Sequence, residues 1–467
     1  MPAHRITLQP RLAPRGTDIY KDGGMRNCFR EDLGDYSLAV KRPGISAAFT
    51  LTAGTAQGIF TLAGIVYAIV SDTIRTTTNA VAAVMPAITI TGQPYDIISD
   101  VLIGASVPTA IIKSTSGMWL FTAAFGCVKV TDVDYPATTV RGAALLDGTF
   151  YVLDTLGNLQ GSSLNDPGVW TALNTIGVDQ SIGVVQAMRR HLNYILVLGD
   201  HGSQAFYDAA NPSPGSPLSP ATNVMYLIGC ASGDSVASLS DNTIFIAKAR
   251  QTGRSVMMFS GLSMVTISSP FVEKLISTVS LTGTSAFGLT IAGHNFYLLS
   301  IPSLPYTLVF DLMGKDWQIW TSYNGTTETA LQFGLPLTYE VRGQPAQGVQ
   351  YLQDLSNGSL VTMSASVYKD LTKAIIAVIR TPIFNGGTSD RKFYSALTLL
   401  GDTVPSTIAI SYSNDDYTSY STPRNADLSV IRKQLRALGS DRYRSFLLTH
   451  TADTALRLEA MEIEVRV

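Results

Sequence analysis

The stretch GIFTLAGIVYAIVSDTIRTT, residues 58–77, decides the fold of this chain. It contains three short apolar runs, which Ala63-Gly64 and Ser71-Asp72 interrupt. Short runs rich in Val, Ile, Phe and Tyr, separated by two residues of turn-forming type, are typical of a meander of antiparallel β-strands. We therefore predict short strands joined by tight turns in this stretch.

Similar units recur along the chain. Most of them have a strand with an aromatic residue, a turn rich in Gly, Asp, Asn or Pro, and a second strand. The units are MWLFTAAFGCVKVTD (118–132), DGTFYVLDTLGNLQ (147–160), HLNYILVLGDHGSQAFY (191–207), DNTIFIAKARQTGRSVMMFS (241–260), GHNFYLLSIPSLPYTLVFD (293–311) and GVQYLQDLSNGSLVTM (348–363). Their aromatic markers, with that of the first stretch, are Tyr67, Trp119, Tyr151, Tyr194, Phe245, Tyr297 and Tyr351.

The spacing of these markers is irregular but mostly falls at roughly 40–55 residues, the range of four-stranded propeller blades. One small antiparallel sheet cannot bury both of its faces, so similar sheets stack around an axis and cover one another. We predict an all-β chain with an irregular β-propeller of about five to seven blades in residues 46–380. Because the repeat is degenerate, a large irregular β-sandwich assembly is the alternative.

The two ends of the chain depart from this pattern. Residues 1–45 have scattered charges and no clean period, which favours an extended N-terminal arm that makes assembly contacts, with a mobile terminus as the alternative. Residues 381–467 are more charged and alternate between apolar and polar positions, which predicts a separate β-sandwich-like domain. The prolines of the arm are Pro2, Pro10, Pro14 and Pro43.

Helix signals are few. The segment 272–279 predicts one short helix, whereas 366–380 is ambiguous and favours a strand in its second half. Trp317 and Trp320 are three residues apart on a predicted strand, so their side chains point to opposite faces. We expect one of them in the core and the other at an interface or on the surface.

The composition indicates a large apolar core and a low content of charged residues. Apolar residues make up 46% of the chain, charged residues 15%, and the formal net charge is −2. A nucleic-acid-binding surface usually needs a strong basic excess, although DNA can still pass a neutral wall without adhering to it. The run from Gly58 to Val70 is too short to cross a bilayer, so we expect no membrane segment. The sparse Cys28, Cys127 and Cys230 fit a reducing compartment such as a bacterial cytoplasm.

No known catalytic pattern is present. The sequence has no GxSxG motif and no phosphate-binding glycine loop, and the histidines lack metal-ligand spacing. We predict no catalytic, cofactor-binding or metal-binding residues, no cofactor and no enzymatic activity, with Cys127 as a structural thiol. The histidines are His4, His191, His201, His294 and His450.

A glycan-acting hydrolase is the main enzymatic alternative, because propellers also carry glycosidases. Such an enzyme needs two carboxylates roughly 5–10 Å apart in one cleft. The acidic candidates mostly fall in expected turns, where aspartate bonds local backbone amides. They are Asp200, Asp208, Asp234, Asp241, Asp311 and Asp316.

Several segments occur in an order that resembles the tail hub, or nozzle, proteins of short-tailed bacteriophages, also called packaged-DNA stabilisation proteins. Two positions depart from the family pattern: Gly199-Asp200 is followed by His201 instead of arginine, and Phe206 replaces an expected tryptophan. The matching segments are KRPGI (41–45), 58–74, LNYILVLGDHGSQAFYDAAN (192–211), 228–261, GHNFYLLSIP (293–302), LVFDLMGKDWQIWTS (308–322), the Ser-Asn-Asp-Asp turn 413–416, Leu438-Gly439 and 442–465.

This resemblance implies a structural component of the virion, assembled in the cytoplasm of the bacterial host. Such proteins form a ring, commonly a hexamer, below the portal and its adaptor. They extend the DNA channel, keep the packaged genome inside the filled head, and attach tail fibres or tailspikes and a needle or plug. Double-stranded DNA would pass through the lumen without sequence recognition.

We further expect residues 1–45 and 381–467 to hold the ring and its adaptor contact. A ring needs a heterologous contact that closes, and an arm can lie along a neighbour's sheet. The competing hypotheses are a glycan-acting hydrolase, a receptor-binding tail protein and a monomeric propeller scaffold that binds proteins.

Overall fold

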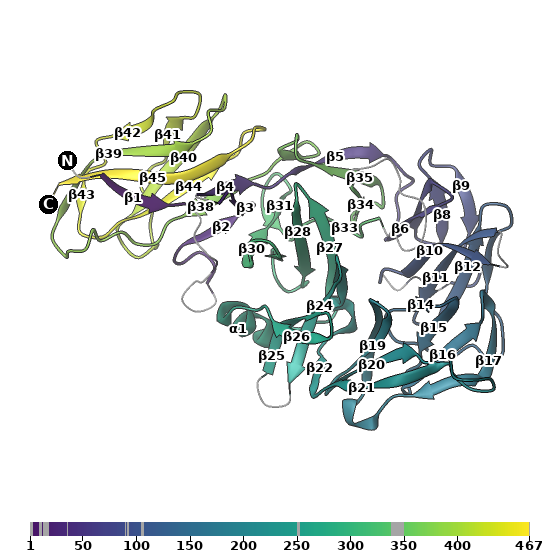
Figure 1. Ribbon diagram of the computed structural model, residues 1–467. Coiled ribbons are helices and arrows are strands. Elements are labelled where there is room, and N and C mark those ends of the chain that lie inside the picture. Colours follow the sequence, from purple (N-terminus) through teal and green to yellow (C-terminus); the bar gives the residue numbers. More distant parts are fainter. Residues whose placement is uncertain are drawn as a thin grey trace.

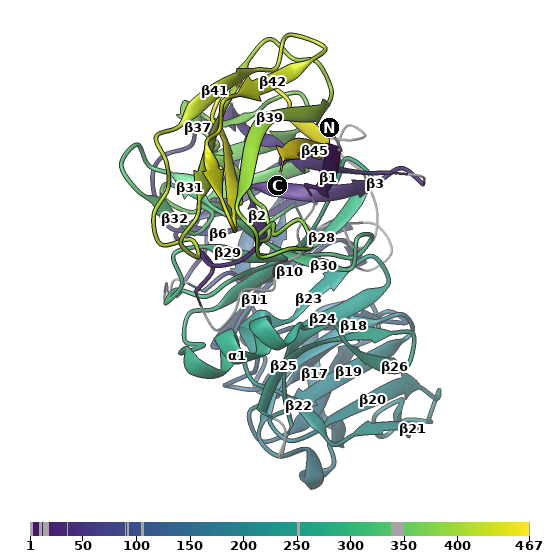
Figure 2. The same ribbon diagram turned by 90° about the vertical axis from the view of Figure 1, so that its left-hand side faces the viewer.

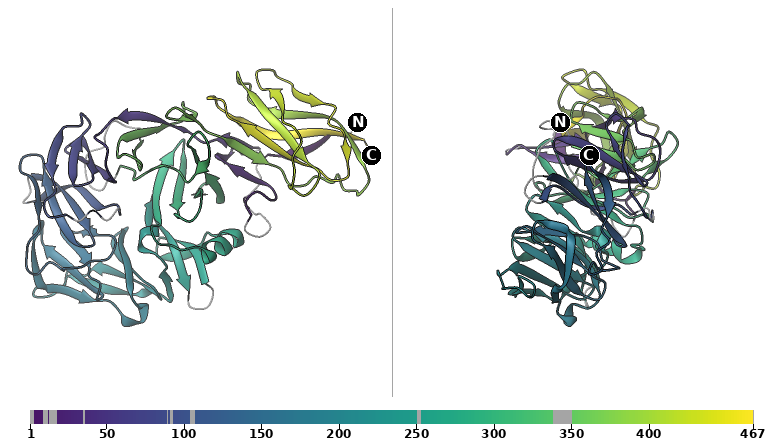
Figure 3. Two further views of the ribbon diagram at one scale, coloured as in Figure 1. Left: turned by 180° about the vertical axis from the view of Figure 1, so that it is seen from behind. Right: turned by 90° about the vertical axis from the view of Figure 1, so that its right-hand side faces the viewer.

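The computed structural model describes residues 3–8, 12, 18–34, 36–88, 90, 93–103, 107–249, 253–337 and 350–466. It consists of a ring of small sheets and a β-sandwich that projects from one side of the ring (Figures 1 and 3). Strands account for 57% of the chain and helices for 3%, so the all-β prediction is confirmed. Among the described residues, no helix has the length and apolar character needed to cross a bilayer.

The ring is built from antiparallel sheets that follow one another along the chain, and we number these blades 1 to 7. The early blades are four-stranded. Blade 1 contains β6 (Ala56–Leu62), β7 (Ile65–Val70), β8 (Thr73–Thr76) and β9 (Val81–Val84). Blade 2 contains β10 (Asp96–Ile103), β11 (Val107–Ser114), β12 (Gly117–Thr122) and β13 (Gly126–Lys129). Blade 3 contains β14 (Ala144–Leu146), β15 (Thr149–Leu153), β16 (Asn158–Ser163) and β17 (Asp166–Gly177).

Blade 4 follows the same four-stranded plan, and blades 5 to 7 carry additions to it. Blade 4 contains β18 (Val185–His191), β19 (Tyr194–Gly199), β20 (Ser203–Asp208) and β21 (Leu218–Tyr226). Blade 5 contains β22 (Ile228–Cys230), β23 (Ala237–Leu239), β24 (Asn242–Ala249), β25 (Gly253–Ser260) and β26 (Ser263–Thr266). Blade 6 contains β27 (Ser285–Ile291), β28 (His294–Ser300), β29 (Thr307–Asp311) and β30 (Asp316–Trp320). Blade 7 contains β33 (Phe333–Gly334), β34 (Gln350–Asp354), β35 (Leu360–Ser364) and β5 (Gly44–Phe49).

Apolar cores fill the spaces between successive blades. Leu62 and Tyr67 of blade 1, for example, share a core with Ile112 and Trp119 of blade 2. Equivalent cores lie between each later pair, and Ile59 with Leu360 closes the circle between blades 1 and 7. The propeller prediction, with its range of five to seven blades, is therefore confirmed.

An N-terminal strand closes the ring. β5 pairs antiparallel with β35, the last long strand of blade 7, so the start of the chain completes the blade that its residues 333–364 begin. β36 (Lys369–Asp370) and β37 (Lys373–Ala374) extend this sheet on the other side of β5.

The sandwich has two facing sheets around one apolar core. Leu397, Met461 and Ile463 of the first sheet pack against Ile410 and Phe446 of the second. The first sheet contains β1 (Ala3–Thr7), β3 (Cys28–Asp32), β4 (Ser37–Lys41), β39 (Lys392–Gly401), β42 (Lys433–Arg436), β43 (Ser440–Asp441) and β45 (Arg457–Arg466). The second contains β38 (Ala377–Arg380), β40 (Thr407–Ser413), β41 (Arg424–Asp427) and β44 (Ser445–His450).

One sheet continues from the propeller into the sandwich. β2 (Gly24–Arg26) lies between β30 of blade 6 and β38 of the sandwich, parallel to the first and antiparallel to the second. The result is a single nine-stranded sheet, ordered β27-β28-β29-β30-β2-β38-β44-β40-β41. Figure 2 shows the sandwich, with β39, β41 and β42, above the blades of the propeller. The two regions are thus joined by backbone hydrogen bonds as well as by the covalent chain.

The N-terminal segment differs from the extended arm that the sequence suggested. β1 adds to β45, β3 and β4 form a hairpin on the same strand, and β2 joins the two regions. The described part of residues 1–45 is therefore built into both regions: Leu8 and Cys28 belong to the sandwich core, whereas Leu12, Phe29 and Ile45 belong to cores of the propeller. Pro2, Pro10 and Pro14 lie outside the described residues.

The helix prediction is confirmed by α1 (Pro270–Thr278), whose N-cap Ser269 accepts a hydrogen bond from the Val272 amide. The ambiguous segment 366–380 forms the short strands β36, β37 and β38. Short connections complete the described structure: the hairpin of β31 (Ser322–Tyr323) and β32 (Glu328–Thr329), and single 3-10 turns at Gln180–Ile182 and Gly233–Ser235.

Trp317 and Trp320 point to opposite faces of β30, but the expectation that one of them would lie at an interface or on the surface is wrong. Both side chains are buried, Trp317 in the core between blades 5 and 6 and Trp320 in the core between blades 6 and 7. The reason is that neighbouring blades cover both faces of each propeller sheet.

Candidate functional site: the domain junction and the axial cavity

The histidine side chains described next make hydrogen bonds within the fold. His191 is buried, with Nδ1 near Thr243 Oγ1 (3.1 Å) and Nε2 near the Gly261 carbonyl (2.6 Å). His294 contacts Asp311 at 2.8 Å, and this hydrogen bond raises the pKa of His294. Within the described ranges, no three His, Cys, Asp or Glu side chains gather as metal ligands.

The thiols of Cys28 and Cys230 are buried, and that of Cys127 is half-buried. Burial raises the pKa of Cys28, Cys127 and Cys230 to about 12 in each case. A thiol with such a pKa carries almost no thiolate at neutral pH, and thiolate is the nucleophilic form. These cysteines therefore have the properties of core residues.

Three of the six acidic candidates have the turn roles expected of aspartate. Asp200 accepts from the Val184 amide, Asp208 from the Ala210 amide, and Asp311 from the Met313 amide. Asp316 pairs with Arg30 at 3.5 Å. Asp234 is the exception, because it lines the axial cavity described below.

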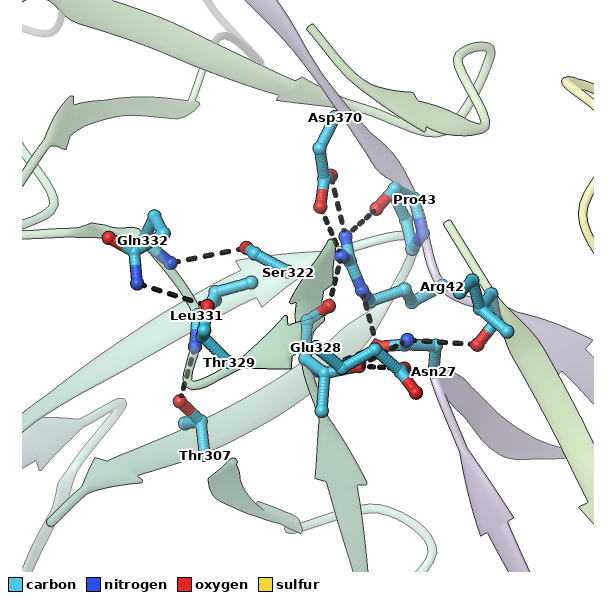
Figure 4. A network of polar contacts seen from close by, with 12 residues as sticks. Asn27, Arg42, Pro43, Thr307, Ser322, Glu328, Thr329, Leu331, Gln332 and Asp370 are labelled. Atoms are coloured by element: carbon cyan, nitrogen blue, oxygen red, sulfur yellow. Dashed lines mark hydrogen bonds and ion pairs between the residues drawn. The ribbon is translucent and has the colours of Figure 1, made fainter. Parts of the chain in front are cut away.

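A fully buried arginine stands where propeller, sandwich and N-terminal segment meet (Figure 4). The Arg42 guanidinium makes a two-pronged ion pair with Asp370, with Nη1 at 3.0 Å from Oδ1. Arg42 Nη2 also donates to the Thr321 carbonyl (2.9 Å), and Nε donates to Asn27 Oδ1 (3.0 Å). Charge-assisted, bidentate bonds of this type are among the strongest in proteins.

Asn27 extends this junction into both regions. Its Oδ1 also accepts from the Thr321 amide at 2.8 Å, and its Nδ2 donates to the Ile376 carbonyl at 3.0 Å. Asn27 has a φ of 54°, a left-handed conformation that asparagine tolerates better than most residues. Arg42, Asn27 and Asp370 therefore connect β4, β2, blade 6 and the strands that follow blade 7.

Gly44, two residues after Arg42, packs closely against the backbone of residues 367–369. The Gly44 amide donates to the Val367 carbonyl at 2.6 Å. A Cβ on Gly44 would lie 2.4 Å from the Lys369 carbonyl oxygen, a backbone atom that cannot move freely. Glycine is thus required where β5 leaves the junction to close blade 7.

Two further titratable groups are buried beside the junction. Lys41 Nζ donates to the Ala452 carbonyl at 2.7 Å, and burial lowers the pKa of Lys41 to about 8. Burial, assisted by the charge of Lys41, lowers the pKa of His450 to about 4. His450 is therefore neutral in the folded protein at neutral pH.

The segment KRPGI (41–45) resembles the family in sequence, but the sequence alone indicated no structural role for it. Nothing in its pattern indicates that Lys41 and Arg42 are buried, because charged residues are normally placed at the surface. The nearest signal is the Pro-Gly pair that follows two cations, directly before a strand.

The second candidate site is a cavity of about 590 Å³ on the axis of the propeller. Every blade contributes to its wall, chiefly through the innermost strands and the residues just before them. Representative wall residues are Gln57, Asp96, Arg141, Arg189, Asp234, Phe287 and Phe333.

A chain of ion pairs crosses this wall. Arg141 lies 2.7 Å from Asp234 of blade 5 and 3.6 Å from Asp96 of blade 2, and Lys113 lies 3.5 Å from Asp96. Burial alone would raise the pKa of Asp96, but Arg141 and Lys113 outweigh it and the pKa is lowered. For Asp234 burial prevails over Arg141, so its pKa is raised.

Asp96 and Asp234 thus share one cavity, as the hydrolase alternative requires of two carboxylates. Asp96, however, also accepts a hydrogen bond from the Gly142 amide at 2.8 Å, in addition to its two cationic partners. The Asp96 carboxylate therefore uses its hydrogen-bonding capacity for contacts within the fold. The arrangement ties blades 2, 3 and 5 together across the axis.

The fold can now be compared with known proteins. A family model described as "Bacteriophage P22 Gp10, beta-propeller" matches residues 29–335, which run from β3 through blade 6 to the start of blade 7. The chain belongs to this phage stabilisation family. It is a structural protein of the phage virion that takes part in stabilising packaged DNA.

No curated protein matches the chain. Solved structures with similar architecture include the N-terminal domain of Nup159 (11% identity, TM-score 0.38, covering 73% of this chain and 98% of that one). A second is BBS1N in complex with ARL6DN, with 10% identity and a TM-score of 0.43, covering 69% of this chain and 98% of that one. A third is BamB from Moraxella catarrhalis, with 10% identity and a TM-score of 0.35, covering 73% of this chain and 97% of that one. Similarities at this level identify no function.

The matched region of the phage stabilisation family includes part of the junction, without Asn27 and Asp370, and the charged wall of the axial cavity. Arg42, Gly44 and the charged wall of the axial cavity lie inside residues 29–335, whereas β34, β35 and the sandwich strands from β38 onward follow it. The resemblance seen at 413–416 and 442–465 thus falls outside the match.

Proposed function

We propose that this chain forms a closed ring, of about six copies, below the portal and adaptor of a short-tailed phage. In this role it extends the DNA channel, closes the filled head, and carries tail fibres or spikes and a plug. Membership of the phage stabilisation family is the observation that carries the proposal.

The geometry supports a channel formed between copies of the chain. The axial cavity, at about 590 Å³, is far smaller than a turn of duplex DNA and is crossed by ion pairs. In the proposed ring, DNA therefore runs through the lumen that the copies surround, and the propeller serves as a docking body beside it.

The propeller also offers many edges for docking. The outermost strands β9, β13, β17, β21 and β26 each pair on one side only within the described sheets. Unpaired strand edges can accept a strand from another chain. They are the natural places for fibres or for a neighbouring copy.

The sandwich is proposed to contact the adaptor, and its most exposed apolar side chain tests this. Ile431, in the loop between β41 and β42, is 92% exposed and has no role in the core. We expect a phage carrying Ile431→Asp to package DNA and then lose it, as measured by genome retention and electron micrographs of purified particles. Leu156→Asp, on blade 3, is the matched control because Leu156 is 87% exposed.

Leu156→Asp particles should keep their genome. Stable, tailed and filled Ile431→Asp particles would contradict the adaptor contact. A gold label inserted in the exposed loop after Asn211 should appear at the outside of the ring below the adaptor, and a label on the head or fibre tips would contradict the ring itself.

A further inference from the structure

The free end of the sandwich carries an exposed aromatic ring among arginines. Phe393, at the start of β39, is 58% exposed and pairs with Ser440 on one side and Arg466 on the other, so these three side chains share one face of the sheet. Arg391 donates from Nε to Ser440 Oγ at 3.1 Å, and the exposed Arg442 directly follows β43. We name Arg391, Phe393, Ser440, Arg442 and Arg466 the arginine face.

This end of the sandwich has an excess of positive charge. Residues 390–393, 436–444 and 464–466, which meet there, contain six cations and three acids, although the net charge of the whole chain is −2. Among the described residues, no ion pair engages Arg391 or Arg442. Arginine and aromatic residues are also the types enriched in protein–protein interfaces. The arginine face therefore favours an acidic partner surface that has an apolar side chain of its own.

Blade 3 and the segments that flank it have the opposite charge. Between Lys129 and Arg189 the chain has six aspartates and one cation, Arg141, which lines the axial cavity. Within the described ranges, none of the six aspartates forms an ion pair. They are Asp132, Asp134, Asp147, Asp154, Asp166 and Asp179.

Two of these aspartates flank an exposed leucine at one end of blade 3. Asp147 lies in the β14–β15 turn, and Leu164 and Asp166 lie in or beside the β16–β17 turn. A hydrogen bond of 2.8 Å from the Asn165 amide to the Gly148 carbonyl holds the two turns side by side. Leu164 is 67% exposed. Asp147, Leu164 and Asp166 form an acidic patch, which combines apolar and charged groups as the arginine face does.

The two surfaces lie on opposite sides of the molecule. Figures 1 and 3 show the sandwich, with both termini at its free end, on one side of the propeller and the outer strands β16 and β17 of blade 3 on the other. One copy therefore cannot bring its own two surfaces together. A contact between two different surfaces repeats from copy to copy, and it gives a ring when the rotation closes.

We propose that the arginine face of one copy docks on the acidic patch of the next copy, and that this contact closes the ring. The inference rests on the proposed ring and names the two surfaces that build it. Phe393 and Leu164 form the apolar centre of the contact, and the arginines and aspartates surround that centre. Such a contact is heterologous, because each copy offers a different surface to each of its two neighbours.

Photo-cross-linking in purified phage particles tests the contact. A benzophenone maleimide is attached at Phe393→Cys in a Cys127→Ser chain, because the other two native cysteines are buried. After illumination we expect a dimer band on a denaturing gel, and mass spectrometry should find the label joined to residues 147–166 of another copy. The same label at Leu156→Cys, in the β15–β16 turn at the other end of blade 3, should give no link to the sandwich. A label at Phe393→Cys that joins the adaptor, DNA or another part of this chain would overturn the contact, as would tailed particles without any link.

Charge reversal gives a second test. We expect Arg391→Glu/Arg442→Glu to lower the yield of filled particles about tenfold or more, because like charges then face each other. Adding Asp147→Lys/Asp166→Lys to the same chain should restore most of that yield. A yield that stays low, in a chain whose thermal midpoint is unchanged, would refute the pairing, and if the midpoint falls the cross-link decides. Electron micrographs separate the two proposals: particles whose tails lack any ring of this chain contradict the ring itself, whereas an intact ring that ignores both charge changes contradicts the arginine face alone.

Discussion

At the scale of single residues, the two regions are fixed to one another by a few buried polar groups. Arg42 and Asp370 are 0% and 4% exposed in their side chains, so each charge depends on the other. Removing one partner of such a pair leaves an uncompensated buried charge, whereas replacing both by apolar groups is often tolerated. The junction is therefore sensitive to single substitutions.

We expect Asp370→Asn and Arg42→Met each to lower the free energy of unfolding by about 3–5 kcal/mol. Urea denaturation followed by circular dichroism measures this change. The neighbouring ion pair of Lys369 and Asp453 is the control, because its side chains are 47% and 45% exposed. Lys369→Gln should cost about 1 kcal/mol or less, and equal losses at both pairs would contradict a special role of the junction.

His450 makes stability depend on pH. Its pKa is about 4 in the folded chain and 6.5 ordinarily, so between these values the unfolded chain binds more protons. Stability therefore falls as the pH falls from about 6.5 to about 4, by on the order of 3 kcal/mol from this group. In the His450→Gln variant, the free energy of unfolding should fall less between pH 6.5 and pH 4. Denaturation curves recorded across this pH range measure the difference. A difference between wild type and variant that stays constant with pH would refute the assignment.

At the scale of elements, the strands were predictable and their partners were not. The unit at 58–77 became β-hairpins because two-residue turns specify local pairing, and in the unit at 293–311 the loop 301–306 joins β28 to β29. β5, β2 and β1 pair with strands more than 290 residues away, and no local pattern encodes such a partner. The buried Trp317 and Trp320 show the same limit of sequence-based prediction. The alternation of side chains along a strand shows which two residues lie on opposite faces, but it does not show whether a face is covered by another sheet.

Closure of blade 7 depends on Gly44. A Cβ there would overlap the Lys369 and Val367 carbonyl oxygens at 2.4 and 2.8 Å, so Gly44→Ala should destabilise the chain by about 1–3 kcal/mol. Gly177→Ala is the control, because the nearest atom to its added Cβ lies 3.9 Å away. Thermal unfolding compares the two. A Gly44→Ala variant as stable as Gly177→Ala would mean that β5 can shift without cost.

At the scale of the whole molecule, the nine-stranded sheet joins the propeller to the sandwich, and we expect the two regions to unfold as one cooperative unit. All four tryptophans, Trp119, Trp170, Trp317 and Trp320, lie in the propeller, so tryptophan fluorescence reports on that region alone. The composition and repeats indicated the propeller, and alternation indicated the sandwich. Neither revealed the axial cavity, which forms only when residues from every blade meet.

Phe446→Ala tests this coupling. Phe446 is fully buried in the sandwich core, and truncating it should cost about 3–5 kcal/mol. Because the sheet is continuous, the midpoint measured by tryptophan fluorescence should fall together with the midpoint measured by circular dichroism. A fluorescence midpoint that stays in place would show that the two regions unfold independently.

The position of β2 also determines how the molecule carries load. Its single parallel contact with β30 and its antiparallel ladder with β38 lie in one plane, so a push on the sandwich along the strands loads those hydrogen bonds in shear. The three residue pairs with β38 and the one pair with β30 would then have to separate together, whereas in peeling they would separate one after another. If the chain forms the proposed ring, a force applied to the sandwich would therefore reach the propeller through this short strand and the buried pair of Arg42 and Asp370, and the two regions would move as a single body.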